Sequence, residues 1–225
     1  KTKEEYFPIL IGGDHSVAIA SALASAKVNI DIGIIWIDAH TDYNTFESTI
    51  TGNIHGLPLA AITGYKCNEL RYYHDGKVIQ PSRTVVVGAR SIDDAEKDNL
   101  RYAGGTVFST EDIKEKGIDA VMDEAFKIAG FKTKGIHISY DIDVIDPYIA
   151  PGVSVPEYDG ITEEQAMGIN EYLVKHINDI VSFDLVEFNP LRDQERKTEQ
   201  IALNVLTQMI NAAEKKKKWE QKTYY

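Results

Sequence analysis

Six apolar runs, each followed by polar residues, constrain the fold of this chain more than any other feature of its sequence. The spacing predicts buried strands at 6–13, 32–38, 83–90, 105–109, 134–143 and 179–190. Because these runs are continuously apolar rather than alternating, they are typical of a parallel sheet covered on both faces. The sequence therefore predicts an α/β fold with three α/β/α layers around a central, mostly parallel sheet.

Patterns that predict helices alternate with these strands. They lie at 14–26, 91–103, 110–129, 162–177 and 197–221, with Asp14 or Ser16 and Thr162 as candidate N-caps. No internal repeat or long linker interrupts the series, so residues 1–225 are expected to form a single domain. The last helix ends in "EKKKKWEQK", where a solvated helix end is favoured over a nucleic-acid-binding patch.

The composition argues against several classes of function. A net charge of −11 over 225 residues disfavours a nucleic-acid partner and an anionic membrane surface. The single cysteine, Cys67, allows no intramolecular disulfide, and no apolar run approaches the roughly 18 residues of a membrane span. With no signal-peptide pattern either, a cytoplasmic protein is expected. The chain enters its first strand almost at once, without a methionine, so we expect an N-terminal part to be missing and an apolar sheet edge to be exposed without it.

Ionisable side chains gather where the predicted strands end. Side chains two positions apart in an extended chain point to the same face, and the carboxyl ends of parallel strands share one edge of the sheet. The residues expected to converge there are His15, Asp38, His40, Asp42, Asp141, Asp143 and Glu187. A lone aspartate at a strand end is usually a turn or cap residue, but two clusters and a histidine at one edge favour a functional site.

The four aspartates of this set predict bound metal. Like charges a few ångströms apart force protonation or destabilise the site unless cations neutralise them. Two divalent ions balance four carboxylates, whereas one leaves excess negative charge. Ligation by imidazole and carboxylate suits Mn, Zn, Fe or Co, and the excess of oxygen ligands favours Mn.

The motifs "GGDHS", "DAHTDYN", "GNIHG", "SYDIDVIDP" and "VEFNP", in this order, resemble the arginase, agmatinase and formimidoylglutamase (ureohydrolase) family, and are most similar to arginases. The resemblance runs from residue 8 to about 210 and implies an arginase-like fold with two Mn²⁺ ions per chain. By resemblance, the first ion is held by His15, Asp38, Asp42 and Asp141, and the second by His40, Asp38, Asp141 and Asp143. Asp38 and Asp141 are thus implied to bridge the two ions.

The resemblance also implies a hydrolytic mechanism. Two metals can hold a bridging water and lower its pKa, so that hydroxide attacks the carbon of a guanidinium group. Asp42 is implied to orient the hydroxide and pass on its proton. His55 is implied to be the general acid and base, a role that suits imidazole, although a loop histidine is the alternative. Glu187 is expected to pair with the guanidinium.

The far end of the substrate distinguishes the activities of the family. Asn44 and Thr51 match positions that bind the α-carboxylate in arginases, and Asp93 and Glu96 match positions that bind the α-amino group. The two acids could instead be first-turn residues that favour the helix dipole. Together the four residues indicate L-arginine as the substrate, hydrolysed to L-ornithine and urea.

One segment departs from the arginase pattern. Residues 151–160 read "PGVSVPEYDG", where arginases usually have "PG(T/V)GTP" followed by two glycines, so Val155 stands in place of a threonine. Ser154 replaces a glycine, and Glu157 lies in a stretch that is normally small and apolar. Because a lost hydroxyl alters discrimination between substrates, agmatinase and formimidoylglutamase activity remain alternatives.

The resemblance implies a homo-oligomer, a trimer or a hexamer, although "ITEEQA" (161–166) lacks the "TYRE" wording that contributes subunit contacts in trimeric arginases. A catalytically silent metal-binding or scaffold relative is an alternative of another class, suggested by the unusual segment and opposed by the complete ligand set. Binuclear phosphoester hydrolysis is a third reading, but no Arg/Lys cluster accompanies the ligands to bind phosphate.

Overall fold

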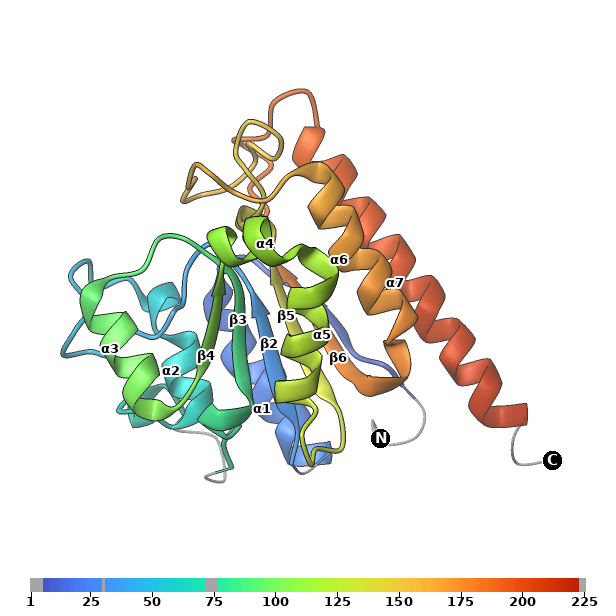
Figure 1. Cartoon of the computed structure of the whole chain (residues 1–225), viewed down its shortest axis with the longest axis horizontal. Coiled ribbons are helices and arrows are strands. Elements are labelled where there is room, and N and C mark those ends of the chain that lie inside the picture. The colour runs from blue at the N-terminus through green and yellow to red at the C-terminus, as the bar shows by residue number, and fades with distance from the viewer. Residues whose placement is uncertain (1–5, 30, 72–76, 223–225) are drawn as a thin grey trace.

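The computed structural model describes residues 6–29, 31–71 and 77–222, without the side chains of 217–222. Six parallel strands form one sheet in the order β1-β6-β5-β2-β3-β4 (Figure 1). The strands are β1 Ile9–Ile11, β2 Gly33–Ile37, β3 Thr84–Ala89, β4 Thr106–Ser109, β5 Ile136–Asp141 and β6 Ile180–Val186. The predicted α/β fold with a parallel sheet flanked by helices is therefore confirmed, and each of the six predicted runs contains one strand.

Helices cover both faces of the sheet (Figure 1). They are α1 Ala18–Asn29, α2 Pro58–Thr63, α3 Asp94–Ala103, α4 Thr110–Lys116, α5 Ile118–Ala129, α6 Glu163–Lys175 and α7 Lys197–Lys222. On β2, Ile35 and Ile37 belong to the core cluster formed with α4 to α7, whereas Ile34 and Trp36 belong to the cluster formed with α1 to α3. The alternation along one buried strand thus supplies two separate cores, which explains why the strand is apolar throughout.

Three helical details differ from the sequence prediction. The expected helix at 110–129 is two helices, α4 and α5, because Gly117 between them has a φ of 82°, a left-handed backbone that ends α4. The expected helix at 14–26 begins as a 3-10 turn, His15–Val17, whose N-cap Asp14 accepts a hydrogen bond from the Ser16 N–H. Helix α2, with Pro58 at its first position, was not predicted. Most of the lysine-rich end of α7 lies outside the described side chains.

The strand order places the polar strand ends side by side. Strands β2 and β5 are neighbours at the centre of the sheet, with Ile37 opposite Tyr140. The residues that follow them, Asp38 and Asp141, therefore leave the sheet next to each other. Strand β6 lies on the other side of β5, which brings the residues after β1 and β6 to the same edge. In the part of the chain that is described, no helix combines the length and apolar character needed to cross a membrane.

Candidate metal centre

Asp38 lies at the end of β2 with its carboxylate fixed on both oxygens. It is completely buried. Its Oδ1 accepts a hydrogen bond from the His40 N–H at 2.7 Å, and its Oδ2 accepts one from the Trp36 Nε1–H at 2.8 Å. Because both donors are held by the same short stretch of chain, the carboxylate is oriented before any ligand binds.

The end of β5 supplies a second pair of carboxylates. Asp141 Oδ1 accepts a hydrogen bond from the Asp143 N–H at 2.8 Å, which closes the 3-10 turn Ile142–Val144. Asp143 Oδ1 accepts one from the Ala39 N–H at 3.2 Å, so this turn is joined directly to the segment after β2. These backbone donors hold two buried acidic side chains at the edge of the sheet.

His15 brings an imidazole to these carboxylates from the turn before α1. Its ring stacks on the Trp36 ring, with centroids 3.7 Å apart and planes 9° from parallel, and its Nε2 bonds with Ser139 Oγ at 2.9 Å. Its Nδ1 lies 2.9 Å from Asp38 Oδ2 and 3.1 Å from Asp141 Oδ2. Yet within the described structure no acceptor or donor stands in hydrogen-bonding geometry to this buried Nδ1. A ring nitrogen without a partner that faces several carboxylate oxygens suits metal coordination.

The ligand atoms fall into two groups that could each hold a metal ion. In each, the donor atoms lie within 4.8 Å of one another, and the groups are His15, Asp38, Asp141 and Asp38, His40, Asp143. His40 Nδ1 lies 3.3 Å from Asp38 Oδ1 and 3.2 Å from Asp143 Oδ2. Asp42 lies outside both groups, with its Oδ2 at 3.3 Å from His15 Nδ1. The structure thus brings the six predicted ligands together, with Asp38 shared by both groups.

The electrostatics of this cluster favour a bound cation. Burial, and then the charge of Asp38, raises the pKa of Asp42 to about 7. Burial also raises the pKa of Asp141 and of Asp143, and the charges of neighbouring aspartates add to the effect. By contrast, although burial opposes it, the neighbouring imidazoles of His15 and His40 lower the pKa of Asp38. Burial and mutual repulsion therefore disfavour four ionised carboxylates in this cluster unless positive charge compensates them.

Two of the predicted catalytic residues have unusual backbone conformations. Asp42 has a φ of 47° and Glu187 a φ of 65°, in the left-handed region that residues other than glycine rarely occupy. Hydrogen bonds hold the Glu187 turn in place, because its N–H donates to Gly13 O and its Oε1 accepts from the His15 N–H at 2.8 Å. Strained backbone that is held in this way is found at functional sites.

His55 lies in the 3-10 turn Ile54–Gly56, outside the two metal-binding groups. The side chain is half-buried, and its turn packs against the turn His15–Val17, where the His15 N–H donates to Glu187 Oε1. Burial raises the pKa of Glu187. The turn that carries the predicted general acid therefore lies beside the turn that binds the predicted guanidinium partner.

The predicted substrate-binding residues are partly brought together. Asn44 Nδ2 donates to Asp93 Oδ2 at 3.2 Å, whereas Thr51 lies on an exposed loop. Glu96 is buried, and its two oxygens accept hydrogen bonds from the N–H groups of Tyr43 and Asp93. Asp93 and Glu96 form the capping box of α3, so both acids have a structural task in addition to the predicted one.

Trp36 and Ser139 hold the candidate metal ligands in place, and the sequence analysis did not identify them. Trp36 both stacks on His15 and binds Asp38, and Ser139 fixes the His15 ring. Each lies two residues before a predicted ligand, on the same face of its strand. The period of two could have identified them, but neither carries charge to draw attention to it.

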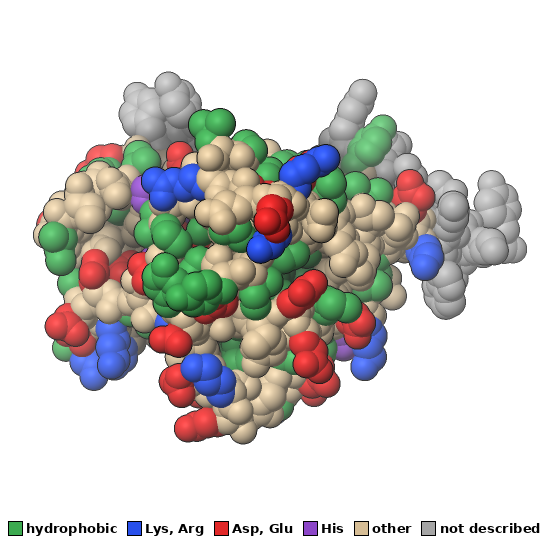
Figure 2. All heavy atoms as spheres, turned by 90° about the horizontal axis from the view of Figure 1, so that it is seen from above, with side chains coloured by type: hydrophobic (Ala, Val, Ile, Leu, Met, Phe, Trp, Pro, Cys, Tyr) green, Lys and Arg blue, Asp and Glu red, His purple; other side chains and the backbone are tan. Residues whose placement is uncertain are grey.

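The surface at the edge of the sheet where the strands end carries no concentration of basic side chains among those drawn in colour (Figure 2). Figure 2 views the molecule from the edge where the strands end, and among the coloured side chains Lys and Arg are dispersed between acidic and apolar ones. This distribution does not favour phosphate binding.

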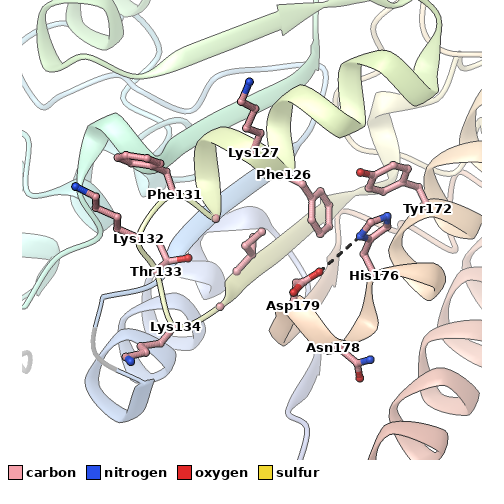
Figure 3. Close-up of a pocket in the computed structure, with 13 residues that line it drawn as sticks. Phe126, Lys127, Phe131, Lys132, Thr133, Lys134, Tyr172, His176, Asn178 and Asp179 are labelled. Carbon is pink, nitrogen blue, oxygen red and sulfur yellow. Dashed lines mark ion pairs between the residues drawn. The ribbon is translucent and has the colours of Figure 1, made fainter.

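A hollow of about 530 Å³ lies between the ends of α5 and α6, at the start of β5 and away from the metal centre (Figure 3). Phe126, Ile136 and Asp179 are among the residues that line it.

Comparisons with known proteins agree with this geometry. A family model described as "Arginase family" matches residues 1–211. An arginase of Bacillus caldovelox is 37% identical over 201 residues, covering 89% of this chain and 67% of that protein. An arginase of Bacillus subtilis (strain 168) is 35% identical over 209 residues, covering 92% of this chain and 70% of that protein. The crystal structure of arginase from Bacillus cereus superposes with a TM-score of 0.85 at 38% identity, covering 90% of this chain and 70% of that one.

Proposed function

Because this chain belongs to the arginase family, we propose that it is a metal-dependent hydrolase that converts L-arginine to L-ornithine and urea. The observation that carries the proposal is the pair of His/Asp groups that share Asp38 at the edge of the sheet. Asp38, Asp141 and His15 are buried there with their other atoms fixed by hydrogen bonds, as metal ligands are.

Two Mn²⁺ ions are the proposed cofactors. The donor set fits them, because it combines two imidazoles with four carboxylates and leaves the buried His15 Nδ1 without a hydrogen-bond partner among the described residues. The proposed sets are His15, Asp38, Asp42 and Asp141 for one ion, and His40, Asp38, Asp141 and Asp143 for the other. When bound, such a metal pair supplies activation of a water molecule near neutral pH.

The remaining chemistry is assigned to side chains. Water adds to the guanidinium carbon, the bond from that carbon to the alkyl nitrogen breaks, and the amine leaves with a gained proton. We assign acceptance of the water proton to Asp42 and donation to the leaving amine to His55. Glu187 binds the guanidinium, and its contact with the His15 N–H supports this by fixing the carboxylate beside the metal ligands.

Recognition of the amino-acid end is assigned to the loop after β2 and to the start of α3. Asn44 and Thr51 bind the α-carboxylate, and Asp93 and Glu96 bind the α-amino group, directly or through water. The hydrogen bond between Asn44 and Asp93 supports this assignment, because it joins a residue of each pair. Agmatine lacks the carboxylate, so contacts to it favour arginine.

The test is a substrate panel on the chain loaded with Mn²⁺. We expect urea from arginine, with agmatine, guanidinobutyrate and formimidoylglutamate hydrolysed at least about tenfold less efficiently, as expected for loss of one polar contact. Val155→Thr in the same panel tests the segment 151–160, and we expect it to raise arginine turnover by a few-fold. Product from another compound alone would reassign the substrate. Two bound Mn²⁺ with no turnover of any compound would favour a silent metal-binding relative.

Metal loading is expected to stabilise the fold. Ligand at about 100 times its Kd contributes about 2.7 kcal/mol, and for a chain of this size each kcal/mol raises Tm by about 2–4 °C. Saturating Mn²⁺ should therefore raise Tm by roughly 5–10 °C in differential scanning fluorimetry. EDTA should reverse the rise, and Mg²⁺, which binds imidazole poorly, should produce a smaller one. Equal Tm values with Mn²⁺ and with EDTA would show that the cluster holds no metal.

A further inference from the structure

Arg90 connects the segment 151–160, called here the rim segment, to the metal centre. Its Nη2 donates to Glu157 O at 2.7 Å and to Asp143 O at 2.8 Å, and its Nε donates to Tyr158 O at 2.9 Å. One guanidinium group thus holds the rim segment and the backbone of a proposed metal ligand at fixed separation. Since Arg90 follows β3, the rim is attached to the sheet itself.

The C-terminal end of the rim segment is held as closely. The Gly160 N–H donates to Asp146 Oδ2 at 3.1 Å, and Ile161 forms an isolated parallel bridge with Ile145. A Cβ atom at Gly160 would lie 2.4 Å from Asp146 N, so the approach requires glycine. Before Glu157, Val153 forms an isolated antiparallel bridge with Phe188, so the rim backbone is anchored on both sides of Glu157.

Glu157 extends from this anchored backbone towards His40. Its Oε1 lies 3.7 Å from His40 Nε2, while Nδ1 of the same ring faces Asp38 and Asp143 at 3.3 and 3.2 Å. The distance of 3.7 Å is within ion-pair range but longer than a hydrogen bond. Nδ1 of His40 thus faces the carboxylates of the metal centre, and Nε2 faces the carboxylate of Glu157 on the rim segment.

The two histidines of the centre differ in exposure and in their outer partner. The His15 side chain is 2% exposed and is fixed by a neutral hydroxyl, Ser139 Oγ, whereas the His40 side chain is 22% exposed and faces a carboxylate. A metal-binding histidine commonly directs its other N–H at a carboxylate or carbonyl, which orients the ring and increases its basicity. His40, the more exposed of the two histidines, is therefore the one whose second ring nitrogen faces a charged residue.

We propose that Glu157 is a positioning residue that orients His40 and strengthens metal binding at the more exposed position. This inference rests on the metal-binding part of the proposed function, but not on the identity of the substrate. It gives the unusual sequence of the rim segment a task, because a carboxylate stands where an arginase-like sequence has a small apolar residue.

The test is a titration of the metal-free protein with Mn²⁺, followed by calorimetry and by electron paramagnetic resonance. In Glu157→Gln we expect one of two binding steps to weaken by about 10–100-fold, as for loss of an outer-shell partner, with the other step unchanged. Release of one Mn²⁺ to a chelator should accelerate by a similar factor. Glu157→Asp should give an intermediate value, because it keeps the charge at a greater distance.

Asp159→Asn is the matched control. It removes a carboxylate from the same rim segment at an exposed residue with a φ of 61°, a conformation that asparagine tolerates. Binding of both ions should be unchanged in this variant, and equal Tm values without metal should show that every variant folds. Tight binding of both ions by Glu157→Gln, or failure of the parent to bind two, would overturn the inference. If the unmutated chain binds two ions but hydrolyses none of the substrates, the proposed activity is wrong. The Mn²⁺ titration of Glu157→Gln still tests the role of Glu157 in that case.

Discussion

Asp141→Asn is expected to reduce hydrolysis by at least about a thousandfold, because it removes a ligand proposed to be shared by both metals. Asp141 is 2% exposed, and its Oδ2 lies 3.1 Å from His15 Nδ1. Asparagine has almost the same volume but no charge, so packing is retained while metal binding is lost. The measurements are urea formation and the Mn²⁺ content of the protein after gel filtration.

The stability of this variant separates loss of metal from loss of folding. Burial and the charges of Asp143 and Asp38 raise the pKa of Asp141, so its ionised form is unfavourable without a cation. Asp141→Asn should therefore leave the metal-free Tm unchanged or higher and abolish the rise caused by Mn²⁺. Asp179→Asn is the matched control at the opposite end of the sheet, where Asp179 Oδ2 lies 3.6 Å from His176 Nδ1. A variant of Asp141 that retains two Mn²⁺ and turns over within tenfold of the parent would contradict the assignment.

The fold and the convergence of the candidate metal ligands could be predicted because they depend on short-range rules. Continuous apolar runs predicted the strands, and the period of two placed Asp38, His40 and Asp42 on one side of the chain. The rule that parallel strands end at one edge then joined this set to Asp141 and Asp143. None of these steps required knowledge of the strand order, since every strand of the sheet contributes to the same edge.

The residues that hold the candidate metal ligands in place could not be predicted in this way. Trp36 and Ser139 act through stacking and a neutral hydrogen bond, and a sequence does not distinguish such residues from ordinary core residues. Arg90 is harder still, because its backbone acceptors include residues 143, 144, 157 and 158, which only the tertiary structure brings together. For Glu96 a sequence motif suggested a role in substrate binding, and the structure shows that its side chain also belongs to the capping box of α3.

The second large effect is expected for His55→Asn, which should lower kcat by about 10²–10⁴-fold, the usual contribution of a general acid or base. His55 lies on a half-buried turn that packs against the turn His15–Val17, whose His15 N–H binds Glu187, so we expect it to protonate a leaving amine bound beside Glu187. It belongs to neither metal-binding group. The variant should therefore keep its full Mn²⁺ content and the Tm rise caused by Mn²⁺, and lose turnover alone.

Steady-state kinetics of His55→Asn with arginine would check this, because loss of a proton donor lowers kcat while KM changes little. His176→Asn is the control, since this histidine stacks on Tyr172 at the far end of the sheet, and its kcat should equal that of the parent. Added imidazole should restore part of the activity of His55→Asn, because the missing group leaves space beside Glu187. A kcat within fivefold of the parent would remove His55 from the mechanism and leave it as a loop histidine, with proton delivery then falling to another group near Glu187.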